Sequence, residues 1–169
     1  EFDLTGEHAR YAYRLLAGLV TPRPIAWVTT QDEEGRVNAA PFSFFNVFGT
    51  RPPILGFAPG DKAPGIPKDT ARNIRRTGEF VVNLVDESCA EAMNQTSAEL
   101  DHGVSEIEIA GLHTFPSSVV APPRIAEAPV SLECREWSTL EIGKNRLVIG
   151  LIDRVHAREG VLDPESLLV

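Results

Sequence analysis

The sequence IAWVTTQDEEGRVNAAPF, residues 25–42, decides the fold of this chain. Its first six residues, Ile25 to Thr30, are mostly β-branched or aromatic, which is typical of a strand. Asp32-Glu33-Glu34-Gly35 forms a turn signal that ends in glycine, and Val37 to Phe42 resumes an extended pattern. The stretch therefore predicts an antiparallel β-hairpin.

Further strands are predicted on both sides of this hairpin. Pro52-Pro53 forces an extended entry into a short apolar run, and a glycine precedes the next run. Two long runs near the end are separated only by Gly143-Lys144-Asn145, which suits a second hairpin. These additional strands are predicted at residues 54–57, 80–85, 130–142 and 146–156.

Helices are expected to be few and short. An amphipathic helix is predicted from His8 to Leu19, and a second begins at a cap on Asp69 or Thr70 and ends at Gly78. A third follows a capping-box pair, Ser88 and Glu91. Residues 97–129, rich in proline, are predicted to be irregular. About six strands joined mostly by turns favour a mainly β, antiparallel barrel over a doubly wound sheet.

Size and charge limit the function classes. The 169 residues, of which 43% are hydrophobic, predict one domain over residues 1–169. A formal net charge of −8 disfavours general binding to nucleic acid or to a lipid surface. No apolar run approaches the roughly 20 residues of a membrane span, and no signal-peptide pattern is present at the start. We expect a cytoplasmic protein with reduced thiols at Cys89 and Cys134.

Signatures of several common active sites are missing. The histidines, His8, His102, His113 and His156, lack metal-ligand spacing, and neither cysteine lies in a CxxC pair, so no metal site is predicted. No serine lies in a GxSxG motif, and Asp101 next to His102 does not by itself form a catalytic pair. The chain has no GxGxxG motif, and the Gly60 to Gly65 stretch lacks the lysine and hydroxyl residue of a phosphate-binding P-loop.

Two stretches point to a ligand. Residues 68–76 carry four basic side chains and one acid at a helix start, where unpaired amides and the helix dipole favour an anion. A solvated basic face explains the same charges equally well. Residues 38–46 combine small, polar and aromatic side chains that suit a flat ligand, although the phenylalanines there are as well explained by a core.

Several motifs recur in order between residues 13 and 161, among them Pro22-Arg23-Pro24-Ile25-Ala26-Trp27, Asn38 to Asn46, Pro67-Lys68-Asp69-Thr70 and Glu79-Phe80-Val81-Val82-Asn83. In these motifs the chain resembles the flavin reductase-like, FMN-binding split-barrel family, of the flavoredoxin and flavoprotein oxygenase type. The resemblance implies a six-stranded antiparallel split barrel with flanking helices. It also implies a homodimer with FMN near the subunit interface.

The resemblance implies roles for particular residues as well. The FMN phosphate is expected against Ser43, Lys68 and Thr70. The residues expected along the ribityl chain and the isoalloxazine are Arg23, Trp27, Thr29, Asn38, Ala40, Pro41 and Phe44. Because the flavin itself carries out electron transfer, no protein nucleophile or metal is required.

One departure from the family pattern concerns electron supply. Related reductases that use NADH or NADPH often carry Gly-Asp-His in the last hairpin turn, where this chain has Gly143-Lys144-Asn145. Asn145 is the candidate for the nicotinamide side. Three hypotheses follow: an FMN-dependent oxidoreductase that uses NAD(P)H, a non-catalytic FMN module that carries electrons for an oxygenase or other redox partner, and a dimeric barrel that has lost its flavin.

Overall fold

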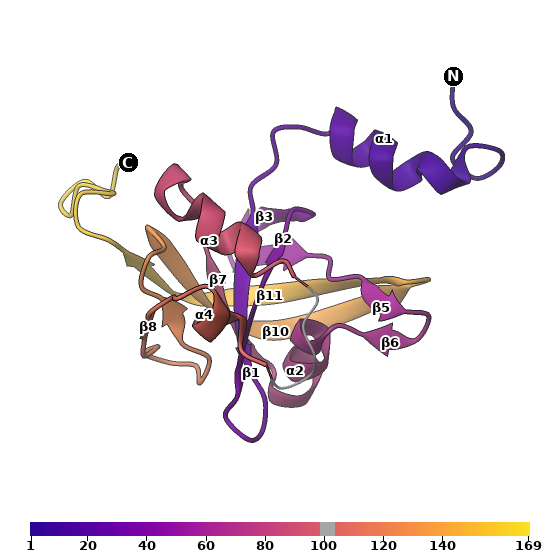
Figure 1. Cartoon of the computed structure of the whole chain (residues 1–169). Coiled ribbons are helices and arrows are strands. Elements are labelled where there is room, and N and C mark those ends of the chain that lie inside the picture. The colour runs from indigo at the N-terminus through magenta and orange to yellow at the C-terminus, as the bar shows by residue number, and fades with distance from the viewer. Residues whose placement is uncertain (99–103) are drawn as a thin grey trace.

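The computed structural model describes residues 1–98 and 104–169, and its main feature is one curved antiparallel sheet (Figure 1). Seven strands follow one another in the order β2-β1-β7-β10-β11-β4-β3. Their bounds are β1 Ala26–Gln31, β2 Val37–Phe42, β3 Phe45–Thr50, β4 Pro53–Phe57, β7 Glu79–Asn83, β10 Val130–Ile142 and β11 Asn145–Ala157. Two small ladders pair β5 (Asp61–Ala63) with β6 (Ile66–Pro67) and β8 (Thr114–Phe115) with β9 (Arg124–Ile125).

The two edge strands of the sheet are neighbours in the chain. Only Ser43 and Phe44 separate β2 from β3, so the sheet must curve until its two edges approach each other. The main core fills the inside of this curve. Its aromatic centre is the row Phe42, Phe57 and Phe80, in which successive ring centroids are 5.4 Å and 5.5 Å apart.

The mainly β, antiparallel class predicted from the sequence is confirmed, with one strand more than the six expected. The predicted hairpin at residues 25–42 forms from β1 and β2, with Gly35 in the left-handed conformation at its turn. The extra strand is β3, Phe45–Thr50, which pairs with β4. Four of its six residues, Asn46, Val47, Phe48 and Thr50, are exposed, so β3 lacks the half-buried pattern that predicts a strand.

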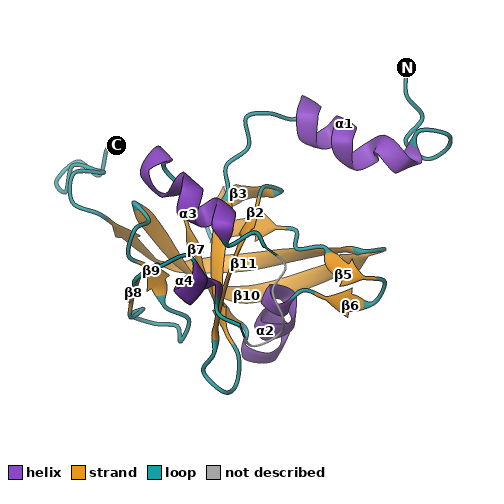
Figure 2. Cartoon of the chain, viewed as in Figure 1, coloured by secondary structure: helices purple, strands orange, loops and turns teal. Residues whose placement is uncertain are grey.

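The helices lie outside the sheet (Figure 2). They are the 3-10 turn η1 (Ala9–Tyr11), α1 (Ala12–Leu19), α2 (Asp69–Thr77), the 3-10 turn η2 (Glu87–Cys89), α3 (Ala90–Gln95) and α4 (Glu106–Ile109). Of these, α2, α3 and α4 pack near β1 and β2, and α1 projects away from the sheet. Among the described residues, no helix is long and apolar enough to span a bilayer.

Two predicted helix starts are wrong in detail. The cap residue of α2 is Lys68 rather than Asp69 or Thr70, because both of these side chains bond elsewhere. The capping box at Ser88 does not form: Asp86 accepts the backbone N–H groups of Ser88 and Cys89 instead. The region predicted to be irregular, residues 97–129, contains α4 and the β8–β9 pair in its described part.

Candidate functional site

A pocket of about 130 Å³ opens between β2, the start of α2 and the segment that follows α3. It brings together half of the predicted flavin-binding residues. Some of these are distant in the sequence: Asn38 and Thr70 are 32 positions apart. The lining residues are Asn38, Ala40, Pro41, Lys62, Lys68, Asp69, Thr70, Thr96, Ser97, Ala98 and Glu106.

Local structure explains this convergence. Asn38 and Ala40 are two residues apart on β2, so both side chains face the same side of the strand. The short side chain of Ala40 leaves room beside them. Across the pocket, the buried Thr70 accepts a hydrogen bond from Asn38 Nδ2 at 3.0 Å. This bond fixes the start of α2 against β2.

Two lysines place positive charge at the start of α2. Lys68 precedes the helix, its Nζ lies 5.9 Å from the centre of the Phe42 ring, and its carbonyl accepts from the N–H of Arg72. Lys62 Nζ lies 2.9 Å from Asp69 Oδ2, while Arg72 donates to the other oxygen of Asp69 at 2.6 Å. Lys62 and Arg72 together offset the negative charge of Asp69. With Lys68 and the helix dipole added, this end of the pocket is receptive to an anion.

Glu106 is the second carboxylate of the pocket. Its Oε2 accepts the backbone N–H of Ala39 at 3.1 Å. Burial raises the pKa of Glu106 above its ordinary value, although this hydrogen bond acts in the opposite direction. Glu106 is therefore easier to protonate than an exposed glutamate.

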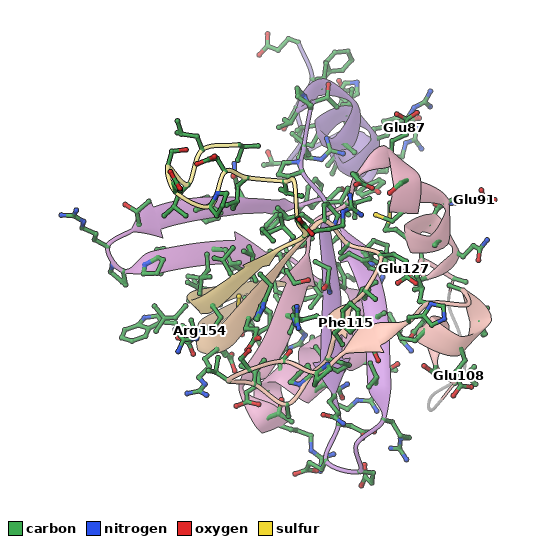
Figure 3. All side chains as sticks on the ribbon, turned by 90° about the vertical axis from the view of Figure 1, so that its left-hand side faces the viewer. Glu87, Glu91, Glu108, Phe115, Glu127 and Arg154 are labelled. Carbon is green, nitrogen blue, oxygen red and sulfur yellow. The ribbon has the colours of Figure 1, made fainter. Side chains whose placement is uncertain are left out.

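Several of the chain's acidic side chains lie away from this pocket. Glu87, Glu91, Glu127 and Glu108 follow one edge of the molecule (Figure 3). Of these, Glu127 accepts from the backbone N–H of His113 and contacts its Nδ1 at 2.9 Å. These glutamates are therefore not part of the pocket lining, whose carboxylates are Asp69 and Glu106.

Trp27 and Thr29 lie behind the pocket wall and have no exposed surface. The indole N–H of Trp27 donates to Thr96 Oγ1 at 2.9 Å, which holds a lining residue in place. Thr29 Oγ1 donates to the carbonyl of Pro123 at 2.6 Å. In this structure both residues support the site from the core, and direct contact with a flavin stays a prediction.

Arg23, Ser43 and Phe44 lie at the other end of β2, outside the lining of this pocket. The Arg23 guanidinium lies 5.6 Å from the centre of the Phe44 ring, and its Nη1 donates to the carbonyl of Ala17 at 2.7 Å. Phe44 is 40% exposed. These three residues therefore extend the candidate site along β2, from the polar pocket toward an aromatic surface.

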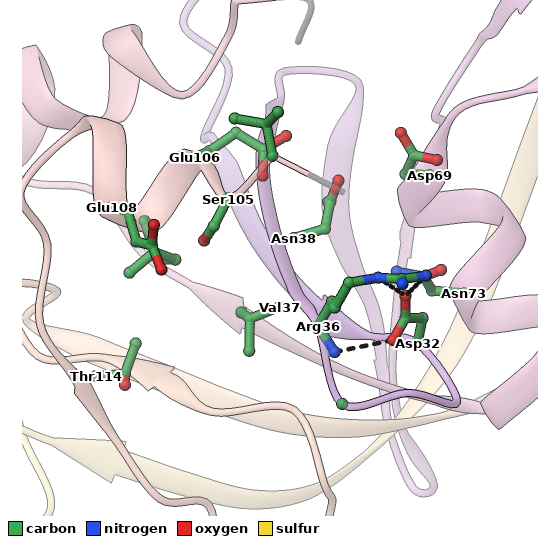
Figure 4. A pocket seen from close by; sticks show the side chains of 13 residues that line it. Asp32, Arg36, Val37, Asn38, Asp69, Asn73, Ser105, Glu106, Glu108 and Thr114 are labelled. Atoms are coloured by element: carbon green, nitrogen blue, oxygen red, sulfur yellow. Dashed lines mark hydrogen bonds and ion pairs between the residues drawn. The ribbon is translucent and has the colours of Figure 1, made fainter. Parts of the chain in front are cut away.

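A larger hollow of about 450 Å³ adjoins the pocket and shares Asn38, Asp69 and Glu106 with it (Figure 4). Its floor carries the ion pair between Arg36 and Asp32, with Arg36 Nε 2.7 Å from Asp32 Oδ2. Glu108 and Thr114 line the far side. The mixture of opposite charges gives this hollow no clear preference for an anion.

Asn145 is not among the residues that line either hollow in the described part of the chain. It is exposed at the start of β11 and forms a backbone bridge with Gly60. Its proposed contact with a nicotinamide stays a prediction. Asp101 and His102 lie outside the described residues.

The lining residues that sequence reasoning missed as site residues include Lys62, Thr96, Ser97 and Glu106. Lys62 is an isolated lysine between two glycines, and nothing in its neighbourhood sets it apart from a surface residue. Thr96 and Ser97 follow a short helix without any recognisable motif. Ser105-Glu106 is one more short motif in which the chain resembles the flavin reductase-like family, and this resemblance is the one signal that could have identified Glu106.

Comparison with known proteins points in one direction. The family model described as flavin reductase like domain matches residues 18–169. An uncharacterized protein of Deinococcus radiodurans is 44% identical over 170 residues, covering 98% of this chain and 75% of that protein.

Two solved structures are similar as well. Nitrilotriacetate monooxygenase component B from Bacillus cereus gives a TM-score of 0.92 at 35% identity, covering 97% of this chain and 84% of its own. The 2-nitrobenzoate 2-nitroreductase NbaA from Pseudomonas fluorescens gives 0.89 at 38% identity, covering 100% and 82%.

Proposed function

We propose that this chain, which belongs to the flavin reductase-like domain family, binds FMN and uses NADH or NADPH to reduce the flavin or a small acceptor. One observation carries the proposal. The pocket at the start of α2 joins Lys68, the buried Thr70 hydroxyl and the helix N-terminus beside the small residues of β2.

The phosphate of FMN fits the charged end of this pocket. Lys68 supplies an ammonium group, and the first turn of α2 has backbone N–H groups without intrahelical acceptors. The hydroxyl of Thr70, oriented by Asn38, adds a further hydrogen-bonding group. About 130 Å³ is below the roughly 300–1,000 Å³ of a typical small-molecule site, so only the phosphate end of the flavin occupies it.

The ribityl chain and the ring system then follow β2 toward Ser43 and Phe44. Ala40 and Pro41 allow a flat group to approach the strand closely. At the far end of the proposed ring site, Phe44 supplies an aromatic ring and Arg23 a positive charge. FMN, when bound, supplies the electron-transfer chemistry. The residues of the chain bind the cofactor, orient it and exclude water from one of its faces.

A second copy of the chain is proposed to cover the other face of the ring. α1 projects from the barrel (Figure 1) and has no buried residue, although Tyr13, Leu16 and Leu19 on it are apolar and exposed. The Tyr13 ring lies 6.1 Å from the ring of Phe44, so this apolar arm adjoins the proposed ring site. Sedimentation with FMN bound tests this point: a monomer of 18.4 kDa that still holds FMN tightly would contradict it.

Flavin binding is tested by titration with FMN and with riboflavin, which lacks the phosphate. Lys68→Ala should weaken FMN by about tenfold to a hundredfold, as expected for a charge-assisted contact of roughly 1.5–3 kcal/mol, and should affect riboflavin much less. Arg75→Ala is the control, because its side chain is 78% exposed on the outer face of α2. Equal losses for both flavins would assign Lys68 to folding.

A second candidate function is an electron-carrying FMN module that serves an oxygenase or another redox partner. The turn at Gly143-Lys144-Asn145 favours it, because Asn145 offers an amide where reductases that the chain resembles often carry a histidine. Anaerobic addition of NADH or NADPH to the flavin-loaded protein separates the two. Bleaching of the flavin spectrum supports the reductase, and an unchanged spectrum supports the module.

A further inference from the structure

The β5–β6 hairpin connects the pocket to the tip of the β10–β11 hairpin, defined here as residues 141–146. It holds five strand residues, too few to be stable without outside contacts. In Figure 1, β5 lies beside the ends of β10 and β11. The backbone joins the two hairpins: Gly60 bridges to Asn145, and the N–H of Asp61 donates to the carbonyl of Lys144 at 3.2 Å.

Two consecutive residues of β5 make contacts in different directions. Asp61 Oδ1 accepts from Arg146 Nε at 2.7 Å, at the hairpin tip. Lys62 Nζ instead reaches Asp69 on α2, and Lys62 lines the pocket. The pairing of β5 with β6 shifts register between Asp61 and Ala63, so Lys62 is the unpaired residue of a bulge. A bulge of this kind redirects a side chain.

The contact with Arg146 is the better protected of the two. The side chains of Arg146 and Asp61 are 13% and 4% exposed, whereas that of Lys62 is 32% exposed. Arg146 also pairs with Glu141 on the neighbouring strand, and this contact links the two strands of the tip. Removing Arg146 would leave the buried Asp61 carboxylate without its ion-pair partner, so we expect β5 to shift and carry Lys62 with it.

We propose that the Asp61–Arg146 ion pair is a positioning device that holds Lys62 as a second cation for the phosphate of the bound flavin. The proposal rests on the proposed function, because it concerns the same pocket. The ammonium group of Lys62 has three N–H donors, and its contact with Asp69 needs one of them. The remaining donors are available on the pocket side, where Lys68 lies as well.

The proposal is tested by fluorescence titration with FMN and with riboflavin. A purely structural role would weaken both flavins alike, so the readout is the loss of FMN affinity relative to the loss of riboflavin affinity. Lys62→Ala should reduce FMN affinity by about tenfold, and Arg146→Ala by a similar factor, while riboflavin affinity changes little for either. Arg154→Ala on the same strand is the matched control, because Arg154 is exposed at the far end of β11 (Figure 3). This control should leave both affinities unchanged.

The double variant decides whether Arg146 acts through Lys62. If it does, Lys62→Ala with Arg146→Ala should lose no more FMN affinity than Lys62→Ala alone. Additive losses, or equal losses of FMN and riboflavin, would overturn the inference. Should Arg146→Ala fail to fold, Asp61→Asn replaces it in the same cycle with the same expected result.

The same titrations distinguish failure of the proposed function from failure of the positioning role alone. Wild-type protein that binds neither flavin would overturn both proposals. Wild-type protein that binds FMN and loses it on Lys68→Ala, but not on Lys62→Ala or Arg146→Ala, would overturn only the positioning role.

Discussion

The two ends of the β10–β11 hairpin are built in opposite ways. At the root, Ser131, Leu132, Glu133 and Cys134 are buried in succession, so side chains on both faces of β10 are covered. At the tip, residues 141–145 are all exposed. One ladder of backbone hydrogen bonds runs through both ends, so the difference lies in the side chains and in what they contact.

Buried polar groups fix the root. Asn83 on β7 accepts from the N–H of Ile125 and the hydroxyl of Ser131, and it donates to the carbonyl of Trp27. The tip is joined to the β5–β6 hairpin by the Asp61–Arg146 ion pair and by the backbone contacts of Gly60 and Asp61. Substitutions at the root should therefore lower the free energy of unfolding. Substitutions at the tip should instead change the affinity for the flavin or the rate of its reduction.

The largest expected effect is at the root. Asn83→Ala removes an amide without exposed surface and leaves several buried partners unsatisfied. Its free energy of unfolding should fall by about 3–5 kcal/mol, measured by urea denaturation. Asn145→Ala at the tip is the matched control and should stay within about 0.5 kcal/mol of wild type. Comparable losses in the free energy of unfolding for the two variants would contradict the difference between root and tip.

A smaller effect is expected where the hairpin crosses the core. A Cβ at Gly150 would lie 2.4 Å from Phe80 Cζ, closer than two non-bonded carbon atoms can approach, and Phe80 is fully buried. Gly150→Ala should cost about 1–3 kcal/mol through overpacking. Gly18→Ala serves as the control, because a Cβ at this position of the exposed α1 would meet nothing within 4 Å. Gly18→Ala should be neutral or slightly stabilising.

Glu133 makes the root dependent on pH. Burial opposes its charge, but the backbone N–H groups of Ser118 and Val119, both at 2.7 Å, and the ring of His156 outweigh this and lower the pKa of Glu133 from 4.5. A lowered folded-state pKa means that the stabilisation is complete above pH 4.5 and is lost as the pH falls through the lowered value.

Glu133→Gln should lower the free energy of unfolding by about 1–2 kcal/mol at pH 7, because neutral hydrogen bonds replace charge-assisted ones. The deficit should shrink as the pH falls below 4.5 and through the lowered pKa of Glu133, since only the wild type loses a charged acceptor. Thermal unfolding at neutral, mildly acidic and strongly acidic pH measures this. A constant deficit across the series would show that the carboxylate charge contributes nothing.

The same contrast explains what the sequence predicts well. β2 and β10 have the predicted bounds because the turn glycines beside them and, in β10, the alternation of apolar and polar residues are local signals. β3 is not predicted because only Phe45 of its apolar side chains is buried while Val47 and Phe48 are exposed, and no local pattern tells such a strand from a ligand-binding loop. The predicted cap of α2 failed because Asp69 bonds to Lys62, a contact that depends on where the β5–β6 hairpin folds.

The candidate site divides in a similar way. Asn38, Lys68 and Thr70 were predicted because they belong to compact motifs, and they lie together in one pocket. Lys62 could not be predicted, because its position depends on a bulge and on an ion pair with Arg146, which is 85 residues away from Asp61 in the chain. Long-range electrostatic contacts of this kind leave no mark in a single sequence.

The smallest expected effect on stability is at the tip. Asn145→His should leave the free energy of unfolding and the FMN affinity unchanged, because Asn145 is exposed and lies outside the pocket lining. If the turn faces the nicotinamide, an imidazole should orient it better than an amide does. Misplacement by about 1 Å slows hydride transfer by up to about 10²-fold, so a gain of about tenfold in the rate of flavin reduction is expected. Anaerobic stopped-flow mixing of the FMN-loaded variant and wild type with NADH and NADPH measures this rate. Equal rates would place the nicotinamide elsewhere, and the absence of reduction in both proteins would favour the electron-carrying module.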